Sequence, residues 1–139
     1  MFGQTFILTL PPGYRVDEVL AFHARDAEGV AEQVSGRTLR KAVLLDGVPV
    51  LFEIEFVQDA AHCRIAADGE LGAAAQLLPD EALRSMLALR IDPAPFADFV
   101  RDDACFGPLV ARQPGLRIVQ SATVFEALTW AIIGQQINL

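Results

Sequence analysis

Apolar and charged side chains alternate through residues 48 to 57, a pattern typical of a β-strand with one covered face and one face in solvent. The apolar face carries Val50, Phe52, Ile54 and Phe56. Glu53 and Glu55 lie on the opposite face, which we expect solvent to reach. Directly before this stretch, Asp46-Gly47 is a two-residue hairpin signal, because both residues tolerate positive φ. The pattern therefore predicts an antiparallel sheet whose apolar face is covered by helices.

Other stretches of the first part of the chain also have the period of two that is typical of strands. Together with turn residues, these patterns predict strands at residues 5–10, 29–34, 37–45, 48–56 and 63–67. A short amphipathic helix is expected from Val16 to about Arg25, with acidic residues in its first turn where the helix dipole favours them. The first part therefore combines one sheet with helices, which is the α+β class.

The second part of the chain is helical in its periodicity. A helix is expected to begin at Pro79, a residue suited to the first helical position, and to extend to Arg90. The period stays near 3.6 from there onward, so we place a domain boundary near Leu89. This divides the chain into an α+β domain at residues 1–89 and the start of an all-α domain at residues 90–139.

The last segment has the sequence of a capped helix. Thr123 and Glu126 have the spacing of a capping box, in which a hydroxyl and a carboxylate accept hydrogen bonds from free amides at a helix start. Gly134 is expected to end this helix, because glycine readily takes the left-handed conformation found after a helix. A helix this apolar needs partner helices on more than one side. We therefore interpret the chain as the front part of a longer protein.

Composition argues against several classes of protein. The chain has 139 residues, is 53% hydrophobic and carries a net charge of −7, so it can form a packed core but lacks a broad basic surface for DNA phosphates. Its longest apolar run, residues 43–57, is interrupted by Asp46, Glu53 and Glu55, so we expect no membrane-spanning helix.

Histidine and cysteine are too few and too scattered to predict a metal site. The two cysteines, Cys63 and Cys105, and the two histidines, His23 and His62, do not have the spacing of zinc ligands. Two cysteines of this kind are typical of reduced thiols, so we expect a cytoplasmic protein with no metal site.

Four runs of sequence carry a resemblance to a known family. They are Thr-Phe-Ile-Leu-Thr-Leu-Pro-Pro-Gly-Tyr at residues 5–14, Phe-His-Ala-Arg-Asp at 22–26, Arg-Gln-Pro-Gly-Leu-Arg at 112–117 and Phe-Glu-Ala-Leu-Thr-Trp-Ala-Ile-Ile-Gly-Gln-Gln-Ile at 125–137. The chain resembles the bacterial DNA-3-methyladenine glycosylase II family of the helix-hairpin-helix DNA glycosylase superfamily. The resemblance implies an antiparallel sheet of about five strands with two covering helices, similar to the TATA-binding protein, followed by the first helices of a truncated helical domain.

The resemblance also implies an activity for a longer parent protein. Such an enzyme flips an alkylated purine out of double-stranded DNA and hydrolyses its N-glycosidic bond, working as a monomer without a cofactor. In this family the catalytic aspartate and the hairpin that grips DNA follow the segment that corresponds to residues 125–137. We therefore expect no catalytic residue within this chain, and we expect the 139-residue chain itself to be inactive.

Two sets of site residues follow from the same resemblance. Phe22 matches an aromatic residue that lines the base pocket, although a phenylalanine on an amphipathic helix is more commonly part of the core. Gln136 matches the side chain that fills the gap left by the flipped nucleotide, and Gln135 and Ile137 share its exposed turn after Gly134. The plain alternative is that these are ordinary turn residues. Trp130 is expected to pack in the core of the helical part.

Two other classes of function remain open on the sequence alone. A small-molecule-binding α+β sensing module would need a sizeable enclosed pocket between its sheet and its helices. A non-catalytic scaffold would use the exposed apolar end helix, including Phe125 and Trp130, as a docking surface. The basic residues Arg37, Arg40 and Lys41 could bind phosphate, but we interpret them as a solvated strand face because the chain is acidic.

Overall fold

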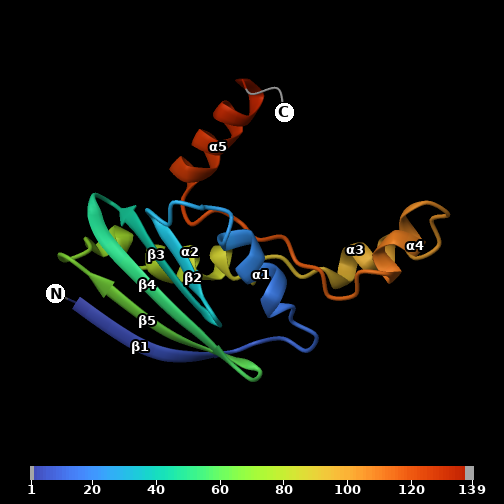
Figure 1. The fold of residues 1–139 in the computed structure, drawn as a ribbon, viewed down its shortest axis with the longest axis horizontal. Helices are drawn as coiled ribbons and strands as arrows, with labels where there is room; N and C mark the ends of the chain where they lie inside the picture. Colours follow the sequence, from blue (N-terminus) through green and yellow to red (C-terminus); the bar gives the residue numbers. More distant parts are fainter. Residues whose placement is uncertain (1, 137–139) are drawn as a thin grey trace.

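The computed structural model describes residues 2–136 and contains a five-stranded antiparallel sheet in the order β1-β5-β4-β3-β2 (Figure 1). The strands are β1 (Phe2–Thr9), β2 (Glu32–Ser35), β3 (Thr38–Leu45), β4 (Val48–Val57) and β5 (Ala60–Ala67). Helices α1 (Val16–His23) and α2 (Leu78–Met86) accompany the sheet, with a short 3-10 turn at Ala73–Ala75 before α2. The α+β class and the five antiparallel strands are confirmed.

The hairpin between β3 and β4 forms where its turn residues predict it. Asp46 and Gly47 have φ values of 49° and 78°, as a two-residue turn of this kind requires. The second predicted strand, at residues 29–34, begins later than expected, at Glu32. The Asp26 carboxylate accepts hydrogen bonds from the Glu28 and Val30 amides at 3.1 Å each, which holds these residues in a turn before β2.

Helices α1 and α2 cover one face of the sheet. Side chains from both layers fill the space between them, and the largest that are fully buried include Leu39, Phe52, Ile54, Phe56, Leu83 and Met86. The opposite face of the sheet is open, with Arg40, Leu51 and Arg64 exposed on it. Because side chains occupy the space between sheet and helices, this layer does not supply the enclosed pocket that a sensing module would need there.

Helix α2 ends before the predicted Arg90 because the backbone reverses at Ala88, which has a φ of 54°. The Ala88 amide donates to the Ser85 carbonyl at 3.1 Å and the Leu89 amide donates to the Arg84 carbonyl at 2.8 Å, which is the Schellman motif. The Tyr14 hydroxyl donates to the carbonyl of Leu87 at 2.7 Å. Burial is the main cause of the raised pKa of Tyr14, so this phenol remains a hydrogen-bond donor.

The chain leaves the sheet after α2 and then returns to it. Helices α3 (Ala94–Phe99) and α4 (Phe106–Ala111) lie to one side of the sheet (Figure 1). We call residues 112–122 the return segment, because they run back beside α1 and α2. The Gln120 amide donates to the Ser85 carbonyl at 3.0 Å, and Ala122 is buried in the same core as the sheet. Part of the chain beyond the proposed boundary near Leu89 thus packs on the first domain, and the boundary itself stays a prediction.

Helix α5 (Val124–Gln136) begins at the predicted cap but does not end at Gly134. The Glu126 amide donates to Thr123 Oγ1 at 3.1 Å, while the Glu126 carboxylate accepts from the Ala122 amide at 2.9 Å instead of from Thr123. The expected turn at Gln135 and Gln136 is wrong, because both residues are helical. Glycine inside a helix costs only about 1 kcal/mol relative to alanine, and glutamine is a good helix former, so the helix continues. Ile137 lies outside the described residues.

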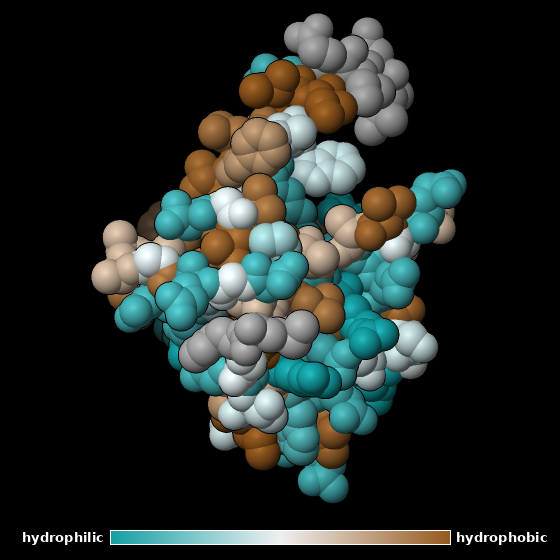
Figure 2. Space-filling view, turned by 90° about the vertical axis from the view of Figure 1, so that its left-hand side faces the viewer, coloured by the Kyte–Doolittle hydropathy of each residue, from teal (hydrophilic) through white to brown (hydrophobic). Residues whose placement is uncertain are grey.

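Helix α5 projects from the rest of the molecule and carries many exposed apolar side chains (Figures 1 and 2). They include Val124, Phe125, Leu128, Trp130, Ile132 and Ile133. Trp130 is 64% exposed, so the expectation of a core position is wrong for the part of the chain that the structure describes. None of the described helices is both long enough and apolar enough to span a bilayer.

Candidate functional site

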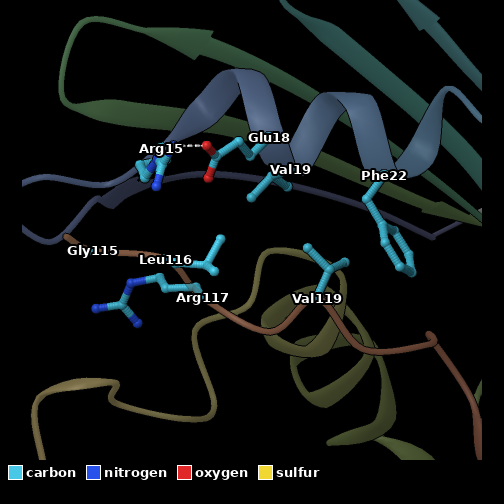
Figure 3. Close-up of a pocket in the computed structure, with 8 residues that line it drawn as sticks. All are labelled: Arg15, Glu18, Val19, Phe22, Gly115, Leu116, Arg117 and Val119. Atoms are coloured by element: carbon cyan, nitrogen blue, oxygen red, sulfur yellow. Dashed lines mark ion pairs between the residues drawn. The ribbon is translucent and has the colours of Figure 1, made fainter. Parts of the chain in front are cut away.

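A cleft of about 200 Å³ lies between helix α1 and the return segment (Figure 3). Its lining residues are Arg15, Glu18, Val19 and Phe22 from the α1 side and Gly115, Leu116, Arg117 and Val119 from the return segment. The two walls are almost 100 residues apart in sequence and meet because the return segment packs on the core. The cleft is therefore a product of the tertiary fold.

Phe22 lies at this cleft because of its position on α1. Val19, Leu20 and His23 take the buried face of the helix, which leaves Phe22 half-buried at its edge, on the side of the return segment (Figure 3). The guanidinium carbon of Arg25 lies 3.7 Å from the centre of the Phe22 ring. This is the geometry of a cation–π contact, in which a positive charge lies over the electron-rich face of an aromatic ring.

Charged groups surround the apolar part of the cleft. Arg15 pairs with Glu18 (Figure 3). It also donates a hydrogen bond to the Gln113 side chain at 2.8 Å. Arg117 donates to the backbone carbonyls of Ala88 and Ile91 at 3.2 and 3.3 Å. These bonds hold the return segment in place and leave one wall of the cleft aromatic and aliphatic.

A second group of polar residues joins α1, β2, β3 and the start of α5, and sequence analysis missed it. We call His23, Glu32, Lys41 and Glu126 the polar cluster. Lys41 is only 5% exposed, so the expectation that Arg37, Arg40 and Lys41 share a solvated face is wrong for Lys41. The alternation of side chains along a strand could have predicted this burial. Lys41 lies on the inner face of β3 with Leu39, while Arg40 points outward.

The polar cluster is connected by short contacts. Lys41 Nζ donates to Glu32 Oε2 at 2.9 Å and to Glu126 Oε1 at 2.5 Å. Glu32 Oε2 also lies 3.0 Å from Nδ1 of His23. On the other side of the imidazole, Nε2 lies 3.0 Å from the Met86 carbonyl, which can only accept, so Nε2 carries a hydrogen.

Lowering the pH should weaken the contacts of the polar cluster, because it protonates the Glu32 carboxylate. Burial opposes ionisation of Glu32 and is the largest single influence, but Lys41 and His23 together hold the pKa below its ordinary value of 4.5. Because the pKa is lower in the folded than in the unfolded state, the cluster adds stability that is fully present above about pH 4.5 and is lost as the pH falls through the folded pKa.

Glu32→Gln should therefore reduce the free energy of unfolding by about 1–2 kcal/mol at neutral pH, and this deficit should shrink as the pH falls below about 4.5. Urea unfolding of both proteins at several pH values measures the difference. Glu55→Gln on the open face is the control and should change the free energy of unfolding by less than about 0.5 kcal/mol. A deficit that is equal at neutral and acidic pH would contradict the role of Glu32.

The structure does not bring the residues at the end of α5 to the cleft. Gln135 is exposed, Gln136 is helical, and the helix that carries them points away from the sheet (Figure 1). Within residues 2–136, no three side chains among histidine, cysteine, aspartate and glutamate are placed to hold a metal ion. Cys63 is buried and Cys105 is exposed, and both are free thiols.

The fold and cleft define a class of protein: an α+β domain with a five-stranded antiparallel sheet covered on one face, and an aromatic residue from its first helix at a cleft. The family model of the AlkA N-terminal domain matches residues 5–122. The chain therefore belongs to the AlkA N-terminal domain family.

A solved structure has the same fold. The 3-methyladenine DNA-glycosylase from Archaeoglobus fulgidus superposes with a TM-score of 0.68 at 22% sequence identity, covering 96% of this chain and 46% of that chain. This chain thus spans less than half the length of that glycosylase. No curated protein matches the chain.

Proposed function

We propose that this chain is the N-terminal part of a DNA glycosylase that flips alkylated purines out of double-stranded DNA and releases them by hydrolysis. The observation that carries the proposal is the position of Phe22 at the cleft of a domain that belongs to the AlkA N-terminal domain family. The parent works as a monomer in the cytoplasm and needs no cofactor. The free thiols of Cys63 and Cys105 are compatible with a reducing compartment.

The chemistry of alkylated purines suits an aromatic wall. Alkylation of a ring nitrogen gives the base a positive charge, so its stacking on Phe22 gains a cation–π component. The same charge makes the base a good leaving group, and the enzyme mainly needs to position the nucleotide and stabilise positive charge on the sugar. The Arg25 guanidinium already lies over the Phe22 ring, so a cation–π contact is sterically possible at this position.

The remaining functional groups belong to a longer protein. The catalytic aspartate and the hairpin that binds the DNA backbone lie outside this chain, so the 139-residue chain is inactive by itself. Gln136 is the side chain that fills the gap left by the flipped nucleotide in the longer protein. The net charge of −7 is consistent with most phosphate contacts coming from that other part.

Release of alkylated purines from methylated duplex DNA tests the proposal. We expect the longer protein to release them, the 139-residue chain to release none, and Phe22→Ala in the longer protein to lower kcat/KM by about tenfold or more, because stacking on an aromatic residue is worth about 1–3 kcal/mol per base. Phe99→Ala is the matched control, since Phe99 is exposed on α3 and is not among the cleft residues. The proposal fails if the longer protein releases no alkylated purine.

A further inference from the structure

Lys41 lies inside the molecule with its charge balanced by two acidic side chains. Its ammonium group is within 2.9 Å of Glu32 and 2.5 Å of Glu126, on separate elements of the fold. Removing a charged ammonium group from water costs free energy unless the charge is paired, and Lys41 is only 5% exposed. These two contacts therefore determine whether the side chain can stay buried. Loss of either carboxylate would leave the buried positive charge of Lys41 with one negative partner fewer.

Glu126 connects this buried charge to helix α5. One of its carboxylate oxygens accepts from Lys41, and the other accepts from the Ala122 amide at the start of the helix. The carboxylate is therefore held in place from two directions. Since Glu126 lies in the first turn of α5, its contact with Lys41 holds the base of the helix on β3.

Apolar packing does little to fix the direction of α5. Val124, Phe125 and Leu128, on either side of Glu126, are all exposed. Helices on the surface of a protein are usually oriented by an apolar face packed on the core. In the described part of this chain that face is bare, and the ion pair with Lys41 joins α5 to the sheet.

The same network reaches the helix that carries Phe22. Glu32 accepts from Lys41 and contacts His23, which follows Phe22 on α1. His23 in turn contacts the Met86 carbonyl at the end of α2. A continuous series of polar contacts therefore joins α2, α1, β2, β3 and α5.

We propose that the Lys41–Glu126 ion pair fixes the direction in which α5 leaves the sheet, and so sets the position of the end of α5 relative to Phe22. Lys41 and Glu126 are positioning residues on this view, because neither lines the cleft. The proposal rests on the proposed function for its consequence in base release. The fixed direction of α5 can be tested without any enzymatic activity.

Amide order parameters from ¹⁵N relaxation of the 139-residue chain measure how firmly α5 is held. We expect the Trp130 and Ala127 amides to have order parameters near about 0.85 in the native chain, and below about 0.6 in Lys41→Met and Glu126→Gln. Glu126→Gln retains an oxygen for the Ala122 amide and leaves Lys41 paired with Glu32, so it keeps the experiment interpretable if Lys41→Met fails to fold.

Arg40→Met is the matched control. Arg40 is next to Lys41 in β3 and pairs with Glu53 at 2.7 Å, but on the exposed face of the sheet, so its loss should leave the α5 order parameters unchanged. The double variant Lys41→Met/Glu126→Gln should be no more mobile than either single variant, because both remove the same contact. Native α5 amides that are already mobile, or variants in which α5 stays rigid, would overturn the proposal.

Base release by the longer protein tests the consequence. There we expect Lys41→Met and Glu126→Gln to lower kcat by about tenfold to a hundredfold, because small errors in placing a substrate have effects of this size. If the unaltered longer protein releases no base, the proposed function fails, while the relaxation experiment still decides the role of the ion pair. If α5 is loosened but base release is unchanged, the proposed effect on positioning is wrong.

Discussion

Replacement of Phe52 by alanine should lower the free energy of unfolding by about 4 kcal/mol, a large part of the about 5–15 kcal/mol typical of a domain. Phe52 is in the middle of β4 with 0% of its surface exposed, between the sheet and the helices that cover it. Removing its ring takes away buried apolar area and leaves a cavity that the surrounding backbone cannot close. Urea unfolding followed by circular dichroism measures the loss.

The control for Phe52 is its neighbour in the same strand. Leu51 is 40% exposed on the open face of the sheet, so Leu51→Ala should cost less than about 1 kcal/mol. The two substitutions share strand and backbone environment and differ in the face on which the side chain lies. Equal losses at the two positions would mean that the face covered by α1 and α2 is not the core.

Gly115→Ala should lower the free energy of unfolding by about 3 kcal/mol and should disturb the cleft beside Phe22. Gly115 has a φ of +73°, and a Cβ there would lie 2.7 Å from the backbone oxygen of Gly13. The variant therefore has both an unfavourable backbone conformation and a backbone collision. The return segment would have to move away from the turn at Gly13, which would shift the cleft residues Leu116 and Val119.

Gly13→Ala separates the two causes. Gly13 has a φ of +72°, but a Cβ there would meet no atom within 4 Å, so this variant should cost only about 1–2 kcal/mol. Chemical unfolding gives both free energies, and amide chemical shifts report any movement at Val119. If Gly13→Ala and Gly115→Ala are equally destabilising, the close approach of the return segment to the turn at Gly13 is not important for stability.

Several features of the fold could be predicted because they depend on neighbouring residues. The turn at Asp46-Gly47 and the alternation after it determine how β3 pairs with β4. The cap at Thr123 likewise depends on a residue three positions away. The end of α2 was harder to predict, because Ala88 has a left-handed conformation that is commonest for glycine and gives little signal in the sequence.

The candidate site was predictable only in part. Phe22 was identified through a family resemblance, and whether it lies in the core or at a cleft could not be decided from the period of its helix. Residues 115–119 form the opposite wall of the cleft. They are remote from Phe22 in sequence and contain no motif that predicts a contact with α1. Lys41 was misassigned because three nearby basic residues were interpreted together, although neighbouring residues of a strand point to opposite faces.

By itself, the sequence determined the class of the fold, the antiparallel pairing around residues 46 and 47 and the capped start of α5, since each follows from contacts between residues close along the chain. Only the tertiary structure decided which charged residues are buried and where the cleft lies. The reason is physical: burial of Lys41 depends on Glu126, 85 positions away, and the cleft forms only after the return segment packs on the core.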